Sequence, residues 1–278
     1  MRTLTERDIQ AILSLLADDD PVVVRAVKEK LFDMGREAVG RVQAAGSSHR
    51  ALREVECLLR RLEEPPLEVQ FESLSRTPGG DLDLEEGTFA IARFGCPAVD
   101  VEGCAEFLDR MAAEVSLRVS ANDHPIHVIR TLNAYLVEEQ GFRGGSVSDS
   151  DNSFMDRVLA RRVGIPITLS AVYLFIGRRL QLPLYGVGMP GHFIVKYEEG
   201  GREIFFNPFH GGQVITKEEC RQIVMRMGFP FEEGVLARTP NRHILIRMMN
   251  NLVRVYLAGR DEGRVRSLME YIQIVQCD

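Results

Sequence analysis

One segment of this chain, residues 167–180, is apolar on nearly every face when it is placed on a helix. Gly164, Ile165 and Pro166 come just before it, and proline is well tolerated at the first position of a helix. The longest nearly apolar run, residues 167–176, has about half of the ~20 residues that span a bilayer. A helix that is apolar all round is buried inside a protein. We therefore expect a central helix that the other elements of a domain enclose.

Three short segments after this helix have the composition and alternation of strands. They are residues 184–187, 193–197 and 203–207, and Glu-Glu-Gly-Gly at 198–201 predicts a hairpin turn between the last two. A helix followed by antiparallel strands indicates an α+β domain. The fold class that we expect is a central buried helix plus an antiparallel sheet, flanked by helical segments at both ends of the chain.

Helical patterns occupy the two ends of the sequence. Residues 1–66 are helical up to a break at Pro65-Pro66, and the string DDDPVVVRAVKEKLFDMGREAV is similar to one HEAT-type repeat. A plain helical bundle fits these residues as well. Residues 241–257 and 265–275 form a later helix pair that resembles a single tetratricopeptide-type hairpin. We expect three domains: residues 1–66, 67–235 and 236–278.

Composition and charge restrict what the protein binds. Its 278 residues include 34 Lys plus Arg and 40 Asp plus Glu, a net charge of −6, and no dense basic run. Proteins that bind nucleic acids usually carry a basic surplus or stripe, so we expect no nucleic-acid partner. Five scattered cysteines without metal-ligand spacing are typical of a reducing compartment. We expect a cytoplasmic protein with no membrane span, no metal and no cofactor.

His192 and Asn207 are the first candidate site residues. His192 comes just before the strand at 193–197, and Asn207 ends the strand at 203–207. If the hairpin forms, the two residues lie near the same end of the sheet, where asparagine can orient the imidazole. A Cys-His-Asn site also needs a thiol, best placed at a buried helix N-terminus where the dipole lowers its pKa.

The residues around this pair resemble a known family. The run NSFMDRVLARRVGIPITLSAVYLFIGRRLQLPLYGVGMPGHFIVKY, followed by FFNPFHGG, strongly resembles the transglutaminase-like core of the SirB-one family. DLDLEEGTFAIAR before it and NRHILIRMMNNLVRVYL after it are similar to that family too, so the resemblance covers residues 68–276. It implies the fold of transglutaminases and papain-like cysteine proteases, in which a Cys begins the central helix and His and Asp or Asn come from adjacent strands.

The same resemblance gives His192 the place of the superfamily histidine and Asn207 the place that usually holds Asp. Active members have Gly-x-Cys before the central helix, whereas this chain has Gly164-Ile165-Pro166. Proline has neither a thiol nor a hydroxyl group, so the site cannot form a thioester. Hydroxyl groups in the first turn or so of the helix, on Thr168 or Ser170, are the alternative nucleophiles.

Two hypotheses for the function follow. The first, which Pro166 favours, is a non-catalytic transglutaminase-like protein that acts as a protein-interaction or regulatory module. The sequence identifies neither its protein partner nor its oligomeric state. The second is an atypical acyl-transfer or amide-hydrolysing enzyme that uses His192 and Asn207 with a nucleophile other than Cys, such as Thr168.

Five arginines lie on two neighbouring predicted helices, at positions 157, 161, 162, 178 and 179. Arginines at a protein surface are usually solvated or paired with carboxylates. We interpret these five as such a face, and a binding patch for an acidic partner is the alternative.

Overall fold

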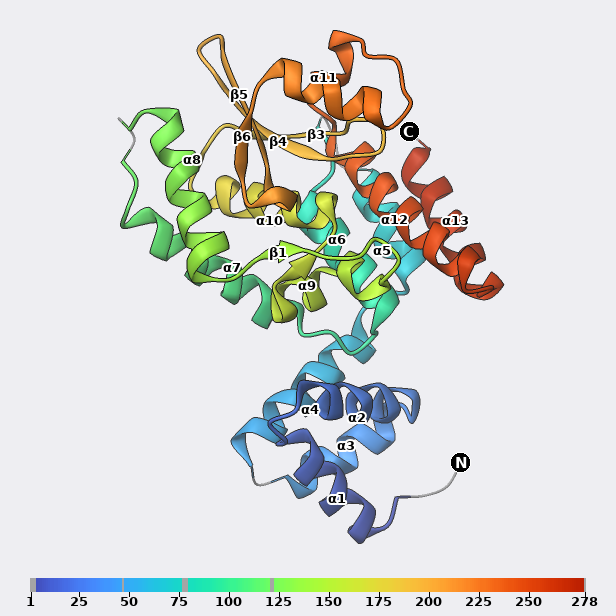
Figure 1. Cartoon of the computed structure of the whole chain (residues 1–278). Coiled ribbons are helices and arrows are strands. Elements are labelled where there is room, and N and C mark those ends of the chain that lie inside the picture. Colours follow the sequence, from blue (N-terminus) through green and yellow to red (C-terminus); the bar gives the residue numbers. More distant parts are fainter. Residues whose placement is uncertain (1–3, 47, 77–79, 121–122, 278) are drawn as a thin grey trace. The chain divides into compact units, whose positions relative to one another are not determined.

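The structure is a computed structural model of the chain, and it describes residues 4–46, 48–76, 80–120 and 123–277 (Figure 1). The chain divides into two compact units. Unit 1 consists of Met1–Gln70 and Ala92–Asp100, and unit 2 consists of Phe71–Ile91 and Val101–Asp278.

Unit 1 is a group of short helices around one apolar core. Its helices are α1 (Glu6–Leu16), α2 (Pro21–Asp33), α3 (Arg36–Ala45) and α4 (His49–Glu63), with the first residues of α5 (Leu67–Ser75) and the last residues of α6 (Leu84–Gly95). Thr5 and Asp8 begin α1 with a capping box, in which each side chain accepts a hydrogen bond from the other residue's N–H group. The helical character that the sequence predicts for this region is confirmed. The HEAT-type repeat stays a prediction.

The borders of the units differ from those of the three expected domains. Unit 1 continues past the Pro65-Pro66 break and includes Ala92–Asp100, because Cys96 is buried in the unit 1 core. The C-terminal helix pair belongs to unit 2, where Leu245 packs so closely on Gly87 that a Cβ atom there would lie 2.7 Å from Leu245 Cδ2. Burial between distant segments sets these borders, and local breaks in the sequence pattern do not reveal it.

Unit 2 encloses the expected central helix. This helix is α10 (Pro166–Arg179), and it is buried on nearly every face. Unit 2 also contains most of α5 and α6. Its remaining helices are α7 (Val101–Ser116), α8 (Pro125–Asn133), η1 (Ala134–Glu139), η2 (Ser150–Ser153), α9 (Met155–Arg161), η3 (Pro208–His210), α11 (Lys217–Arg226), η4 (Glu233–Leu236), α12 (Asn241–Ala258) and α13 (Glu262–Gln276). Among the described residues, none of the helices combines the length and the apolar character that crossing a bilayer requires.

A four-stranded antiparallel sheet packs on α10. Its strands are β3 (Leu184–Val187), β4 (Ile194–Glu199), β5 (Arg202–Asn207) and β6 (Gln213–Ile215), in the order β3-β4-β5-β6. Helix α10 lies against one face of the sheet and α11 against the other (Figure 1). Gly200 and Gly201, with φ of 57° and 77°, form the two-residue turn between β4 and β5. The expected α+β fold and its hairpin are confirmed, and the short edge strand β6 is an addition.

A pair of two-residue strands leads into α10. Strand β1 (Arg143–Gly144) lies parallel to β2 (Val163–Gly164), which ends just before the helix. A Cβ atom on Gly164 would lie 2.7 Å from the hydroxyl oxygen of Thr168. The absence of a side chain at Gly164 therefore leaves room for Thr168 at the start of α10.

Ion pairs hold the C-terminal end of α10. Glu85 on α6 is buried and accepts hydrogen bonds from Arg178 at 2.8 Å and from two nitrogens of Arg179 at 2.6 and 2.8 Å. Asp83 also pairs with Arg178 at 2.7 Å, and Asp109 on α7 pairs with Arg179 at 2.6 Å. These contacts join three helices of unit 2, so carboxylates compensate both arginine charges.

The arginines at the end of α9 have partners as well. Arg157 and Arg161 pair with the aspartates of residues 149–151. The guanidinium carbon of Arg162 lies 4.3 Å from the centre of the Phe107 ring. The interpretation of a carboxylate-paired face is therefore confirmed for four of the five arginines, and the fifth stacks on an aromatic ring.

Candidate functional site

His192 lies in the turn between β3 and β4. Its N–H group donates to the Met189 carbonyl group at 3.2 Å, and Gly191 in the same turn has a φ of +71°, which glycine adopts without strain. Arg247 on α12 donates from Nη2 to the carbonyl oxygens of Met189 and His192, both at 2.7 Å. One guanidinium group thus fixes both ends of the turn that carries His192.

Asn207 ends β5 and connects two histidines. His192 Nε2 lies 3.2 Å from Asn207 Oδ1, and Asn207 Nδ2 lies 3.0 Å from His210 Nδ1. The structure therefore brings His192 and Asn207 together, as the pairing of their strands predicts. It adds His210, on the one-turn helix η3, to the same chain of hydrogen bonds.

These hydrogen bonds determine where the His192 proton lies. An amide oxygen can only accept, so Nε2 of His192 carries the proton and Nδ1 keeps a free lone pair. Burial lowers the pKa of His192; the hydrogen bond to Asn207 raises it, and the electrostatic effects of the neighbouring His210 and Arg247 lower it further. The net direction is downward, so the imidazole is neutral near pH 7 and able to accept a proton or a hydrogen bond.

Among the described residues, the side chain of His192 is hydrogen-bonded to Asn207 and to no Ser, Thr or Cys, although Ser148 lines the same cavity. Pro166 occupies the first position of α10. The hydroxyl group of Thr168 donates to the Asn152 carbonyl oxygen at 2.8 Å and accepts from the Ile165 N–H group at 3.0 Å. None of its hydrogen bonds reaches His192, so its geometry is that of a helix cap and not of the nucleophile considered above.

The hydroxyl of Ser170, the other candidate, is fully buried and has no hydrogen-bond partner among the described residues. Cys96 and Cys220 are buried as well, and no cysteine lines the cavity described next. Burial, with a smaller effect of Glu219, raises the pKa of Cys220 to about 11. A thiol with so high a pKa is almost entirely protonated near pH 7 and is a poor nucleophile.

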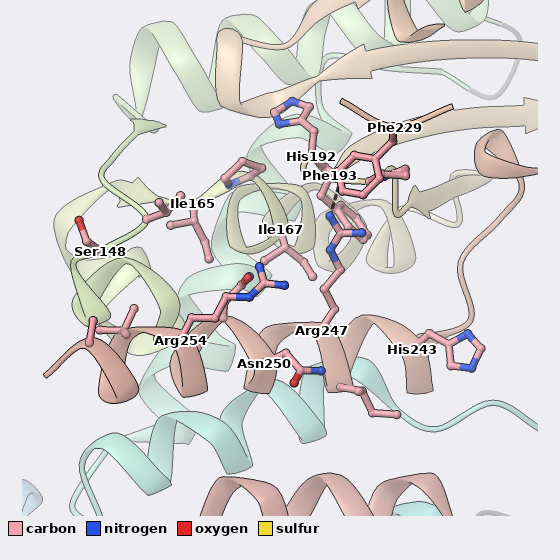
Figure 2. A pocket seen from close by; sticks show the side chains of 18 of the residues that line it. Ser148, Ile165, Ile167, His192, Phe193, Phe229, His243, Arg247, Asn250 and Arg254 are labelled. Carbon is pink, nitrogen blue, oxygen red and sulfur yellow. Dashed lines mark hydrogen bonds between the residues drawn. The ribbon is translucent and has the colours of Figure 1, made fainter. Parts of the chain in front are cut away.

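A cavity of about 970 Å³ opens beside His192 (Figure 2). Its size lies near the upper end of the range for small-molecule sites. The start of α10, the β3–β4 turn and one face of α12 form its walls, and its lining includes Ile165, Ile167, Phe193, Phe229, Arg247 and Arg254. Groups of three or more His, Cys, Asp or Glu side chains that could hold a metal ion are absent from the described residues.

Comparison with known proteins identifies the family. Residues 102–250, more than half of the chain, match the transglutaminase-like superfamily. A UPF0162 protein from Xylella fastidiosa is 31% identical over 201 residues, which make up 67% of this chain and 69% of that protein. The chain belongs to the transglutaminase-like superfamily and to its UPF0162 proteins.

Other relatives extend the comparison. A UPF0162 protein from Vibrio cholerae is 30% identical over 167 residues, 59% of each chain. Human F-box only protein 21 is 30% identical over 146 residues, which cover 49% of this chain and 22% of that protein. No solved structure shows significant similarity to the chain. The narrower SirB-one resemblance stays a prediction.

Sequence reasoning missed the polar face of α12. His243, Arg247, Asn250 and Arg254 follow one another at spacings of four, three and four residues, so they lie on one side of the helix. That spacing is the signal for this face, whereas the apolar residues of the same helix predict only how it packs. The transglutaminase-like site therefore includes cationic groups from a helix that begins more than 30 residues after Asn207.

Proposed function

We propose that this protein is a non-catalytic member of the transglutaminase-like superfamily, and that the cavity beside His192 serves binding. In this proposal the protein is an interaction or regulatory module that acts in the cytoplasm through a protein partner. The cysteines are scattered along the sequence without metal-ligand spacing, which supports the cytoplasmic location.

The observation that carries the proposal is the start of α10. By the family resemblance, Pro166 at the start of α10 takes the place of the superfamily nucleophile, and the nearby Thr168 hydroxyl is engaged with backbone groups. A neutral imidazole without an adjacent thiol or hydroxyl group has no protein nucleophile to activate. The site has a turn that is held in place by Arg247 and a cavity beside it, and both are features of a binding site.

The relatives support a modular role. The homologous region makes up 22% of human F-box only protein 21, so the same domain occurs within a much longer chain. A domain that recurs within a longer protein is expected to fold and to bind as a unit. We propose such a role for unit 2 here.

Amide hydrolysis and acyl transfer test the non-catalytic proposal directly. We would measure ammonia release from glutamine-containing peptides and labelling by acyl probes, using wild type, His192→Gln and the exposed-histidine control His49→Gln. We expect the same background rate and labelling in all three proteins. Higher activity in wild type and His49→Gln than in His192→Gln would overturn the proposal.

One observation favours the enzyme alternative. His192 is hydrogen-bonded to Asn207, lines the cavity and is neutral near pH 7 because its pKa is lowered, so it can accept a proton as a general base does. In that case an external molecule such as water, and not Thr168, is the nucleophile. The assay above separates the two functions, because this alternative predicts turnover that His192→Gln abolishes.

We propose that unit 1 contributes to partner recruitment. Leu15 and Val22 are 41% and 59% exposed on its first two helices. Deleting the N-terminal residues would expose the apolar surroundings of Cys96, so substitutions in the full chain are the better test. Leu15→Lys with Val22→Lys is expected to remove proteins that the wild type captures, whereas Leu117→Lys, at an 82% exposed residue of unit 2, is not. An unchanged set of captured proteins would contradict this role.

A further inference from the structure

The cavity beside His192 has one cationic wall. Arg247 and Arg254 lie about two turns apart on α12. Arg254 reaches toward Ile167 at the start of α10, and Arg247 reaches toward the turn that carries His192 (Figure 2). Arg242 and His243 of the same helix also line the cavity. Among the described residues that line it, there is no Asp and no Glu. An anionic group in this cavity would meet only positive or neutral side chains.

The two central arginines have unused hydrogen-bond donors. Arg254 is exposed and forms no hydrogen bond or ion pair with any described residue. Arg247 uses Nη2 for two backbone carbonyl groups, and its Nη1 and Nε atoms have no acceptor among the described residues. Burial lowers the pKa of Arg247, and the charge of Arg254 lowers it further, so the two groups repel each other. A bound carboxylate would relieve this repulsion and accept two or more hydrogen bonds.

The opposite wall of the cavity is apolar. Ile165 and Ile167 lie at the start of α10, and Phe193 and Phe229 come from the loops that precede β4 and follow α11. Phe229 is 48% exposed, so a ligand there would cover aromatic surface. This wall favours a ligand with an apolar body next to its charge.

His192 supplies a third requirement. It is only 7% exposed, its Nε2 is bonded to Asn207, and its Nδ1 atom has no partner among the described residues. A lone pair on a neutral imidazole accepts a hydrogen bond from an N–H or O–H group. A matching ligand therefore combines a carboxylate, an apolar group and a hydrogen-bond donor.

We propose that the cavity binds an N-acylated apolar amino acid with a free carboxylate, which is the chemistry of the C-terminal residue of a peptide. The carboxylate lies between Arg247 and Arg254, the side chain lies on the apolar wall, and the amide N–H group donates to Nδ1 of His192. This inference rests on the proposed function, because it makes the cavity the binding site of a non-catalytic protein. The source is a free acylated amino acid or the end of a protein chain.

Calorimetric titration of the full chain tests the site. The ligands are N-acetyl-leucine and the peptide acetyl-Ala-Ala-Ala-Leu, each with a free carboxylate and as its neutral C-terminal amide. We expect binding of at least one free acid, and about tenfold weaker binding of its amide, since a charge-assisted hydrogen bond of this strength corresponds to such a factor. Equal affinity of the two acids would show that the terminal residue suffices, and a clear preference for the peptide would indicate a protein C-terminus.

Matched variants locate the binding. Arg254→Gln is expected to weaken binding of the free acid by about tenfold and to have little effect on the amide. Arg266→Gln, at an exposed arginine of α13 outside the cavity, is expected to bind as the wild type does. Absence of binding by both acids, equal binding of acid and amide, or unchanged binding by Arg254→Gln would overturn the inference.

The hydrolysis and labelling assay keeps the two proposals apart. Turnover that depends on His192, with carboxylate binding intact, would overturn the non-catalytic proposal and leave the anion site standing. Absence of both turnover and binding would overturn the anion site alone.

Discussion

The two ends of α10 differ in how their neighbouring arginines are compensated. At the C-terminal end, Arg178 and Arg179 pair with three carboxylates, among them the buried Glu85. At the N-terminal end, Arg247 and Arg254 of α12 line a cavity. Among the described residues, no Asp or Glu side chain lines this cavity. The pairs at one end join helices and so serve the fold. Unpaired arginines at a cavity do not stabilise the fold through ion pairs and are available for a ligand.

The largest expected effect comes from breaking the paired end. Glu85→Gln removes the buried partner of two arginines, and we expect a loss of about 3 kcal/mol in the free energy of unfolding. This value is the lower end of the cost for breaking a buried ion pair, because Asp83 and Asp109 still pair with the two arginines. Urea denaturation measures it. Glu86→Gln, at the exposed neighbouring residue, is the control. Equal stability of the two variants would mean that the ion pairs are not structural.

The next test compares the two arginines at the cavity. Arg247→Gln leaves the carbonyl oxygens of Met189 and His192 without a charged donor, and we expect a loss of about 2 kcal/mol in the free energy of unfolding. Arg254→Gln is expected to change it by less than about 0.5 kcal/mol. A large loss in Arg254→Gln would show that this arginine has a structural partner, and would weaken its assignment to a ligand.

A smaller effect is expected at the start of α10. Thr168→Val removes the cap between Ile165 and the Asn152 carbonyl group, at a cost of about 1 to 2 kcal/mol in the free energy of unfolding. Ser170→Ala is the matched control, because the Ser170 hydroxyl has no partner and its removal leaves no group unsatisfied. Thermal or urea unfolding measures both. Equal effects would contradict the role of Thr168 as a cap.

The smallest expected effect is a dependence of stability on pH. Burial, with smaller electrostatic effects of His210 and Arg247, holds the pKa of His192 below its usual value of 6.5 in the folded state, although the hydrogen bond to Asn207 acts in the opposite direction. As the pH falls below about 6.5, the unfolded state therefore binds protons first, and folding stability falls. The stability of wild type relative to His192→Gln is expected to decrease from pH 7.5 to about pH 5. His49→Gln changes an exposed histidine, and we expect its stability relative to the wild type to be independent of pH. If the stability difference between wild type and His192→Gln is also independent of pH, the pKa of His192 is not lowered.

Much of the fold follows from local patterns in the sequence. An all-apolar helical segment predicted α10, and Gly200 and Gly201 between alternating residues predicted the hairpin that brings His192 to Asn207. Strand β6 was not predicted, because three residues at a sheet edge carry too little pattern. The unit borders were not predicted either, because they depend on which distant segments bury Cys96.

The sequence alone determined that the chain has a central helix, with a histidine and an asparagine at one end of a sheet. That Pro166 takes the place of the superfamily nucleophile stays a prediction from the family resemblance. Only the tertiary structure decided that Thr168 caps the helix and that Arg247 holds the turn of His192. It alone placed Arg254 at the same cavity. The reason is physical: helix and turn patterns arise from neighbouring residues, whereas a cavity and its charges arise where segments far apart in the sequence pack together.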